Sequence, residues 1–479
     1  MKLSFHGAAK TVTGSKHLIH LDNSKKILLD CGLFQGLGRD TIELNNQWGF
    51  EPAEINYVIL SHAHIDHVGL LPKLIKDGFS GTIYCTEQTR ELSGLLLMDS
   101  ARIQEMEAQQ INEIREAQKR DLVTPLYTEE DVAAIFSKIV VVPYNTPCRI
   151  DDDIELLLTN SGHVIGSAAI SLTLTESTGQ TSIAFSGDIG RFNDMMLCDP
   201  DVFPQADYII MESTYGNKLH NILHSSTEKL LECIEEICLN RQGKLIIPAF
   251  SLGRTQEVLY LLNRLENEKR LPDVKYYLDS PLSVKATEIT KLHTDSLNDR
   301  VRELLTKDDD VFKFQGLQYV EHINDSIALS DRDEPCVIIS ASGMAEAGRV
   351  KYHISQHIQN PACGILLVGY CEPHSLGGQL HNGKKQVSIY GQEHDVKAEV
   401  FSIDSMSAHG DYEDLCKWIG CQDTEKVRHV FLVHGEYDTQ IAFKDRLHKK
   451  GFHSVTIPAM HQEIVPEELE RTHVAKAIL

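Results

Sequence analysis

The chain has 479 residues, of which 42% are hydrophobic and 24% are charged. This length corresponds to two or three domains, each long enough to bury its own core. Only 15 residues are proline, and the composition excludes disordered and fibrous proteins. The eleven cysteines form an odd set with no Cys-x-x-Cys pair, so the sequence indicates neither a disulfide framework nor a cysteine zinc knuckle.

Membrane and export signals are not apparent in the sequence. No apolar run reaches the roughly 20 residues of a membrane span. The first residues, Met1 to Gly7, lack the charged and then apolar layout of a signal peptide. We therefore expect a cytoplasmic protein with reduced cysteines and no membrane partner.

The charge of the chain is unevenly distributed. The formal net charge of −23 repels a polyanion at long range. Residues 216–390, however, carry 20 Lys and Arg against 23 Asp and Glu, so this middle block is nearly neutral. Because the local potential decides where a ligand docks, the overall acidity does not exclude an anionic substrate.

Short β-rich runs alternate with helical stretches over the first two hundred residues. Their content of Val, Ile, Leu and Thr predicts strands at 26–30, 57–61, 82–85, 139–143, 154–159, 168–175, 182–186 and 208–212. The longest helical pattern, over residues 89–119, is amphipathic and is expected to cover a sheet.

The middle block predicts a second α/β unit. Its expected helices are 226–239, 254–267 and 348–357, and its expected strands are 244–248, 274–278 and 335–340. After residue 385 the β-rich pattern returns at 387–390, 397–403, 430–433 and 455–457, and residues 462–479 read as a charged helix or tail. We therefore expect residues 217–385 to be a domain inserted into one α/β domain formed by residues 1–216 and 386–479.

The sharpest local signal lies directly after the strand expected at 57–61. His62, His64, Asp66 and His67 place three imidazoles and a carboxylate within six residues, a ligand set that suits zinc. Downstream, His163 and Asp188 each lie in a glycine-containing loop next to an expected strand. Either residue alone would be a turn residue, but together with the histidine run they favour a metal site over a polar turn.

These residues resemble the metal-binding motifs of the metallo-β-lactamase superfamily, as does Asp30 in Leu29-Asp30-Cys31-Gly32. Other motifs are similar to those of its β-CASP branch, namely Met211–Gly216, Pro248–Gln256, Asp279–Leu282, Ser340–Met344, Gly369–Tyr370, Ser407–His409 and Leu432–Glu436. The resemblance covers nearly the whole chain. It implies an α/β protein with a four-layer αββα metallo-β-lactamase fold and an inserted α/β β-CASP domain.

The resemblance also implies the site and its chemistry. It implies two zinc ions, one held by His62, His64 and His163 and the other by Asp66, His67 and His434, with Asp188 bridging them. It further implies His409 as general acid, Asp66 and Glu212 as catalytic residues, and Asp30 and Glu212 as supports that orient ligand histidines. The branch contains RNA-cleaving enzymes similar to the cleavage and polyadenylation endonuclease subunit, so we expect hydrolysis of single-stranded RNA by a hydroxide shared between the metal ions.

Contacts to the substrate are expected in the near-neutral block. Cations in or beside the branch motifs could follow a phosphate backbone, and a serine-containing turn before a helix could offer N–H groups to a phosphate. The expected substrate-binding residues are Arg254, Lys285, Ser340, Ser342, Arg349 and Lys351. A solvated surface or internal ion pairs would be the alternative role of the cations.

Other functions remain as alternatives. A small-molecule metallo-hydrolase acting on a thioester or lactone would need neither the inserted block nor His409. A non-catalytic RNA-processing scaffold would have no reason to keep every metal ligand. A DNA-processing enzyme of the branch usually has a valine in the motif around His434, so the histidine favours RNA. Whether the enzyme cuts internally or trims from the 5′ end, and whether it forms a homodimer, stays open.

Overall fold

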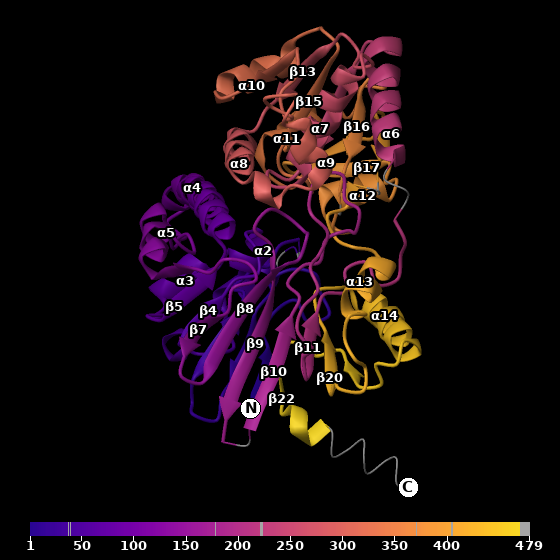
Figure 1. The fold of residues 1–479 in the computed structure, drawn as a ribbon. Coiled ribbons are helices and arrows are strands. Elements are labelled where there is room, and N and C mark those ends of the chain that lie inside the picture. The colour runs from indigo at the N-terminus through magenta and orange to yellow at the C-terminus, as the bar shows by residue number, and fades with distance from the viewer. Residues whose placement is uncertain are drawn as a thin grey trace. The chain divides into compact units, whose positions relative to one another are not determined.

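The computed structural model describes residues 1–36, 38, 40–177, 179–220, 224–369, 371–403 and 406–469. The chain forms two compact units. The first unit comprises Met1–Phe192, Asp199–Leu219 and His409–Leu479, and the second unit comprises Asn193–Cys198 and His220–Ala408. Figure 1 shows the strands and helices of both units.

The first unit contains two seven-stranded sheets and the helices that cover them. Its strands are β1 (Lys2–Phe5), β2 (His17–His20), β3 (Lys26–Leu29), β4 (Tyr57–Ile59), β5 (Thr82–Cys85), β6 (Ile139–Val141), β7 (Cys148–Asp151), β8 (Ile154–Asn160), β9 (Ala168–Glu176), β10 (Gly179–Phe185), β11 (Tyr208–Met211), β20 (His429–Leu432), β21 (Val455–Thr456) and β22 (Gln462–Ile464). Its α-helices are α1 (Asp40–Asn46), α2 (Ile65–Val68), α3 (Leu71–Lys76), α4 (Glu87–Ala117), α5 (Glu129–Ile135), α13 (Tyr412–Ile419) and α14 (Tyr437–Lys449). The strand orders are β22-β1-β2-β3-β4-β5-β6 and β21-β20-β11-β10-β9-β8-β7.

Three hydrophobic cores define four layers in the first unit. The central core joins side chains of both sheets, for example Phe5 of β1 and Phe431 of β20, whose ring centroids are 5.5 Å apart. A second core packs the outer face of the β1–β6 sheet against α2 to α5, and a third packs the outer face of the β7–β11 sheet against α13 and α14. The order helix, sheet, sheet, helix confirms the expected αββα architecture.

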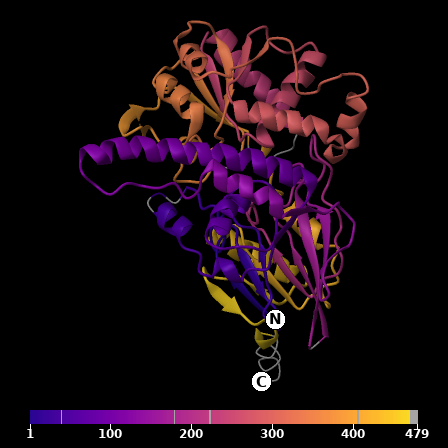
Figure 2. The same ribbon diagram turned by 90° about the vertical axis from the view of Figure 1, so that its left-hand side faces the viewer.

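Helix α4 shows how local sequence defines an element of the outer layer. The Thr86 side chain caps it by accepting a hydrogen bond from the Thr89 N–H, and the amphipathic pattern continues for 31 residues. Its first half is buried against the unit, whereas Met106 and Ile114 in its second half are about 60% exposed. Figure 2 shows this long helix from the side. The helix predicted over residues 89–119 therefore exists, shifted by two residues.

The second unit is built on a parallel sheet of six strands. Its strands are β12 (Lys244–Pro248), β13 (Lys275–Leu278), β14 (Leu317–Tyr319), β15 (Cys336–Ser340), β16 (Gly364–Leu367) and β19 (Glu399–Ser402), beside a hairpin of β17 (Gln386–Ile389) and β18 (Gln392–Asp395). Its helices are α6 (His224–Ile234), which continues as a π-helix over Glu235–Asn240, α7 (Arg254–Asn267), α8 (Pro281–Leu292), α9 (Asp299–Leu304), α10 (Ile323–Asp331), α11 (Gly348–His357) and α12 (Leu376–His381). The strand order is β14-β13-β15-β12-β16-β19.

The structure places the domain boundaries elsewhere than the sequence analysis did. The second unit extends to Ala408 instead of residue 385, because β19 pairs with β16 from Glu399 to Ser402 and so completes the parallel sheet. Residues 193–198 also belong to the second unit, where Leu197 forms a β-bridge with Leu297. From its composition alone, a β-rich run after residue 385 could belong to a sheet of either unit. The pairing of β19 with β16 places this run in the second unit.

The C-terminal stretch differs from the prediction of a charged helix or tail only at its start. Residues Gln462–Ile464 form β22, which pairs with β1 at the edge of the first sheet, whereas residues 466–469 are helical. Residues 470–479 of the predicted tail lie outside the described residues. Within the described part of the chain, no helix is long and apolar enough to span a membrane.

The packing between the two sheets predicts a measurable stability loss. Phe431→Ala removes a fully buried ring from the central core and should lower the free energy of unfolding of the first unit by about 3–5 kcal/mol. Both tryptophans, Trp48 and Trp418, lie in this unit, so intrinsic fluorescence in a urea titration reports its unfolding. Ile42→Ala, at a side chain that is 72% exposed, is the control and should change the value by less than about 0.5 kcal/mol. Equal losses in both variants would contradict the assigned core.

Candidate metal centre

The candidate site lies at the carboxyl ends of strands in both sheets of the first unit. Asp30 follows β3 and the histidine run follows β4, and these two strands are parallel neighbours. Asp188, Glu212 and His434 follow β10, β11 and β20, which are also parallel neighbours. Parallel strands present their carboxyl ends at one edge of a sheet, so residues far apart in sequence meet there.

The turn before Asp188 requires a glycine. Gly187 has a φ of +54°, and a Cβ on this residue would lie 2.4 Å from the Ser61 Cβ. A side chain at this position would therefore be both strained and in collision with the histidine turn. The glycine lets the loop after β10 approach the loop after β4 and brings Asp188 to the histidines.

One group of ligand atoms consists of His62, His64, His163 and Asp188. The His64 Nδ1 lies 3.1 Å from the His62 Nε2 and 3.2 Å from the His163 Nε2. The Asp188 Oδ2 lies 3.5 Å from each of those Nε2 atoms. Four ligands bound at about 2.0–2.1 Å in a tetrahedron are roughly 3.3 Å apart, so the spacing fits one metal ion.

A second group consists of Asp66, His67 and His434. The His434 Nε2 is 3.3 Å from the His67 Nε2 and 3.4 Å from the Asp66 Oδ2, and the Asp66 Oδ2 is 3.9 Å from the His67 Nε2. The Asp188 Oδ2 is also 3.3 Å from the His67 Nε2. The structure thus brings together all seven predicted ligands, and one oxygen of Asp188 lies beside both groups.

Neighbouring polar groups fix the orientation of two of these histidines. The His67 Nδ1 is 2.7 Å from the Asp30 Oδ2, and Asp30 also accepts the Ser61 N–H at 2.7 Å. The His434 Nδ1 is 3.0 Å from the Thr214 Oγ1. With Nδ1 engaged in this way, each ring is left with Nε2 as its ligand atom. Asp30 and His434 have φ values of +58° and +48°, a strain typical of functional sites.

Burial and charge set the protonation of the site. Burial lowers the pKa of His62 well below its usual value and that of His64 to about 4, so both imidazoles are neutral at pH 7 and can act as ligands. Burial opposes protonation of His67 as well, but the carboxylates of Asp188 and Asp30 raise its pKa well above the usual value. A cation bound there would displace this proton, so metal affinity should fall at acidic pH.

His409 and Glu212 lie next to these two groups. The His409 Nδ1 is 3.3 Å from both carboxylate oxygens of Glu212 and 3.8 Å from the Asp188 Oδ2. Glu212 is fully buried and accepts the Ile189 N–H at 2.6 Å, which fixes its carboxylate. Burial would lower the pKa of His409, but Glu212 and Asp188 raise it to about 8. The His409 ring is therefore held by a buried anion beside the metal ligands.

Two residues of the site had no role in the sequence analysis. The Ser61 side chain donates to Asp30 at 2.8 Å, and Thr214 holds His434. Ser61 directly precedes the histidine run, and Thr214 stands two residues after Glu212. Their position next to predicted ligands was the only signal, because a hydroxyl gives no pattern of its own.

The expected substrate contacts lie in the second unit, and three of them have internal partners. Arg254 is 4% exposed and forms an ion pair with Glu257. Arg349 donates to the Asp279 carboxylate at 2.6 Å, and the Ser340 hydroxyl donates to the Asp279 carbonyl oxygen at 2.8 Å. These bonds hold the second unit together and agree with the alternative of internal ion pairs for the two arginines, and contact of the three residues with phosphate stays a prediction.

The other three expected contacts are accessible. Lys285 is exposed on α8, and Ser342 is half-buried in the turn before α11. The Lys351 ammonium donates to the Glu346 carbonyl oxygen at 3.0 Å. Their roles remain predictions, to which we return below.

The two histidines on α11, His353 and His357, have structural contacts. His353 is fully buried, with Nε2 2.6 Å from the Asp279 Oδ2 and Nδ1 2.9 Å from the Ser330 Oγ. His357, one turn later, is 9% exposed. These contacts join α10 and α11 to the end of β13.

The contact between Asp30 and His67 predicts an effect on metal affinity. Asp30→Asn keeps the size of the side chain and tolerates the positive φ, but it removes the negative charge beside the His67 Nδ1. Metal affinity should fall about 10- to 100-fold, which competition with a chelator measures. Asp152→Asn, at a carboxylate that is 97% exposed, is the matched control. An unchanged affinity in Asp30→Asn would show that Asp30 does not support the site.

Comparisons with known proteins agree with this geometry. Family models match for the metallo-beta-lactamase superfamily over residues 15–237, for the Beta-Casp domain over residues 255–380, and for a Zn-dependent metallo-hydrolase RNA specificity domain over residues 393–458. The chain resembles the crystal structure of a protein of unknown function from Enterococcus faecalis V583 with a TM-score of 0.52 and 13% identity, over 97% of this chain and 99% of that one. That likeness concerns the fold alone.

Curated relatives are similar over most of their length. Ribonuclease TTHA0252 of Thermus thermophilus is 31% identical over 94% of this chain and 97% of its own length. Transcription termination factor FttA of Methanocaldococcus jannaschii is 29% identical over 94% of this chain and 70% of its own length. The two convergent ligand groups, the αββα layers, the inserted parallel-sheet unit and these similarities lead to one conclusion: the chain belongs to the β-CASP branch of the metallo-β-lactamase superfamily and is a metal-dependent hydrolase.

Proposed function

We propose that this protein is a zinc-dependent ribonuclease that hydrolyses phosphodiester bonds of single-stranded RNA. The observation that carries the proposal is the convergence of seven ligand side chains into two groups that share Asp188, with His409 beside them. The names of the relatives and the match to the RNA specificity domain support RNA as the substrate.

We infer two zinc ions from the chemistry of the donor set. His62, His64 and His163 would hold one ion, Asp66, His67 and His434 the other, and Asp188 both. Imidazole nitrogens with few carboxylates suit zinc better than magnesium or calcium, which prefer oxygen ligands. When bound, such ions lower the pKa of water and polarise a phosphate oxygen.

The side chains around the metal ligands would carry the proton chemistry. Hydrolysis of a phosphodiester needs a proton for the departing oxygen, and His409 would donate it. Glu212 would act as a positioning residue, because it holds His409 by Nδ1 and leaves Nε2 as the atom that can face a substrate. Asp66 would contribute to catalysis as a metal ligand, through the Oδ2 atom that lies next to His67 and His434.

Substrate contacts and location complete the proposal. Lys285, Ser342 and Lys351 would contact the RNA backbone, since Lys285 is exposed and the other two residues are half-buried. No disulfide joins any of the eleven cysteines, all of which lie in the described part of the chain, and this supports a reducing compartment such as the cytoplasm.

Digestion of end-labelled single-stranded RNA tests the function directly. Purified protein loaded with zinc should cleave the RNA, and cleavage should stop when a chelator removes the metal. A parallel assay with a thioester and a lactone should show no comparable turnover. Products of intermediate length would indicate internal cuts, and release of the 5′ label alone would indicate trimming from that end. Intact RNA together with rapid thioester turnover would contradict the proposal.

A histidine variant separates proton donation from metal binding. His409→Ala should keep the bound metal and lower RNA turnover about 10²- to 10⁴-fold, because the departing oxygen loses its acid. Asp188→Asn should lose metal, since this carboxylate lies beside both ligand groups. Metal analysis and turnover of the two proteins are measured together. Equal loss of metal in both variants would contradict the proposed division of roles.

A further inference from the structure

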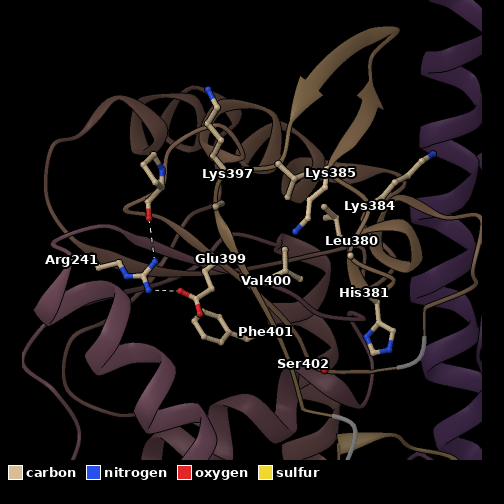
Figure 3. A pocket seen from close by; sticks show the side chains of 14 residues that line it. Arg241, Leu380, His381, Lys384, Lys385, Lys397, Glu399, Val400, Phe401 and Ser402 are labelled. Atoms are coloured by element: carbon tan, nitrogen blue, oxygen red, sulfur yellow. Dashed lines mark hydrogen bonds and ion pairs between the residues drawn. The ribbon is translucent and has the colours of Figure 1, made fainter.

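A cavity of about 500 Å³ lies in the second unit, and none of its lining residues is a predicted metal ligand (Figure 3). Its walls come from the end of α12, from the segment leading to β17 and from residues 396–402, together with Arg241 and Pro361. Every lining residue belongs to the second unit. Residues 396–402 fall within the match to the RNA specificity domain, but no lining residue has a role in the proposed metal site or in the proposed substrate contacts.

The lining shows that the cavity follows the edge of strand β19. Seven consecutive residues, 396–402, line it. Side chains of a strand alternate between the two faces of a sheet, so a cavity on one face would touch every second residue only. In Figure 3, Glu399 and Phe401 extend toward Arg241, whereas Val400 lies on the side of Leu380 and Lys385. A cavity that contacts both sides must run along the strand edge itself.

Strand β19 has an open edge with unused backbone groups. It is the last strand of the six-stranded sheet, and among the described residues it pairs with β16 alone. The Glu399 N–H donates to Cys363 and the Ile403 N–H donates to Leu367, so alternate residues face β16. Val400 and Ser402 therefore direct their N–H and C=O groups toward the cavity. All four residues of β19 are half-buried, whereas β16 is fully buried.

The charge of the cavity selects an anionic partner. Its lining contains Arg241, Lys384, Lys385 and Lys397 against the single carboxylate of Glu399. Arg241 forms ion pairs with both Glu399 and Glu236, and the Lys397 ammonium lies 4.0 Å from the Asp395 Oδ2, so the charges of these two cations are partly offset. Lys384 and Lys385 are exposed and have no ion pair with a carboxylate of the described residues. These two lysines give the lining a positive charge in a chain whose net charge is −23.

We propose that the edge of β19 binds an extended acidic peptide segment of another protein, which adds a seventh strand to the sheet. Backbone groups of the peptide would pair with Val400 and Ser402, and acidic side chains would contact the lysines. A peptide matches this edge better than RNA does, because a second strand presents N–H and C=O groups alternately at the same repeat as β19, which the backbone of RNA does not. The side chains of Val400 and Leu380 add an apolar floor that suits alternate apolar residues.

Fluorescence anisotropy of a labelled peptide tests the proposal. The probe is a peptide of about ten residues that alternates Val and Glu, the length of a long strand. Full-length protein should bind it, and should bind a matched Val and Lys peptide at least about tenfold more weakly. The variants of the peptide site should cleave RNA at the same rate as the wild-type protein, so this test is independent of the proposed ribonuclease activity.

Two variants, each with a matched control, locate the binding. Val400→Pro removes the outward N–H without touching the bonds to β16 and should weaken binding about tenfold, whereas Val400→Ala keeps the N–H and should bind nearly as wild type. The double variant Lys384→Glu with Lys385→Glu should weaken peptide binding at least as much. Its control is the double variant Lys275→Glu with Lys307→Glu, which changes the net charge by the same amount at residues that do not line the cavity. This control should bind the peptide as the wild-type protein does.

Several results would overturn the proposal. These are absence of peptide binding by the wild-type protein, equal binding of the Val and Lys peptide, or unchanged binding by Val400→Pro and the lysine double variant. If the lysine double variant loses RNA affinity and Val400→Pro does not, the cavity binds RNA instead of a peptide. A self-association seen by sedimentation and abolished by Val400→Pro would assign the edge to a second copy of this chain. If Val400→Pro does not fold, as judged by circular dichroism, the lysine pair and its control decide.

Discussion

The Asp188 carboxylate is the group around which the first unit is organised. It is 1% exposed and lies 3.3–3.5 Å from the Nε2 atoms of three histidines. Burial alone would raise its pKa, but His434 and His67 lower it well below the usual value, so the group stays ionised. Burial of an anion costs free energy unless a cation or several hydrogen-bond donors compensate its charge. The nitrogen lone pairs of the surrounding imidazoles provide places where such cations can bind. The neighbouring loops meet at this group.

The fold supplies these side chains through a simple rule. Each ligand follows the carboxyl end of a strand or stands in a loop next to one, and two parallel regions, β3–β4 and β10–β11–β20, turn their ends toward the same place. The central core holds the two sheets together, and Asp30, Ser61 and Thr214 then fix the rings of His67 and His434. Packing and chemistry are therefore coupled. Each ligand group takes residues from both sheets, so a shift between the sheets would break up both groups.

The sequence predicted the parts that depend on local pattern. Helices α7 and α11 begin and end at the predicted residues, and the histidine run was recognisable because four ligands lie within six residues. The set of distant ligands came from the resemblance to the family, as no spacing shows that His434 reaches His67. The parts that local pattern does not predict depend on tertiary partners. The sequence does not show that Arg254 and Arg349 form ion pairs with Glu257 and Asp279. It also does not show that β19 joins the sheet of the second unit, or that β22 forms at the start of the stretch predicted as a helix or tail.

X-ray diffraction at the zinc absorption edge, from crystals of the zinc-loaded protein, tests directly whether the seven ligand side chains bind two zinc ions. The account predicts two anomalous peaks about 3.5–4 Å apart, one among His62, His64 and His163 and the other among Asp66, His67 and His434, with Asp188 between them. A single peak, or peaks away from Asp188, would contradict it.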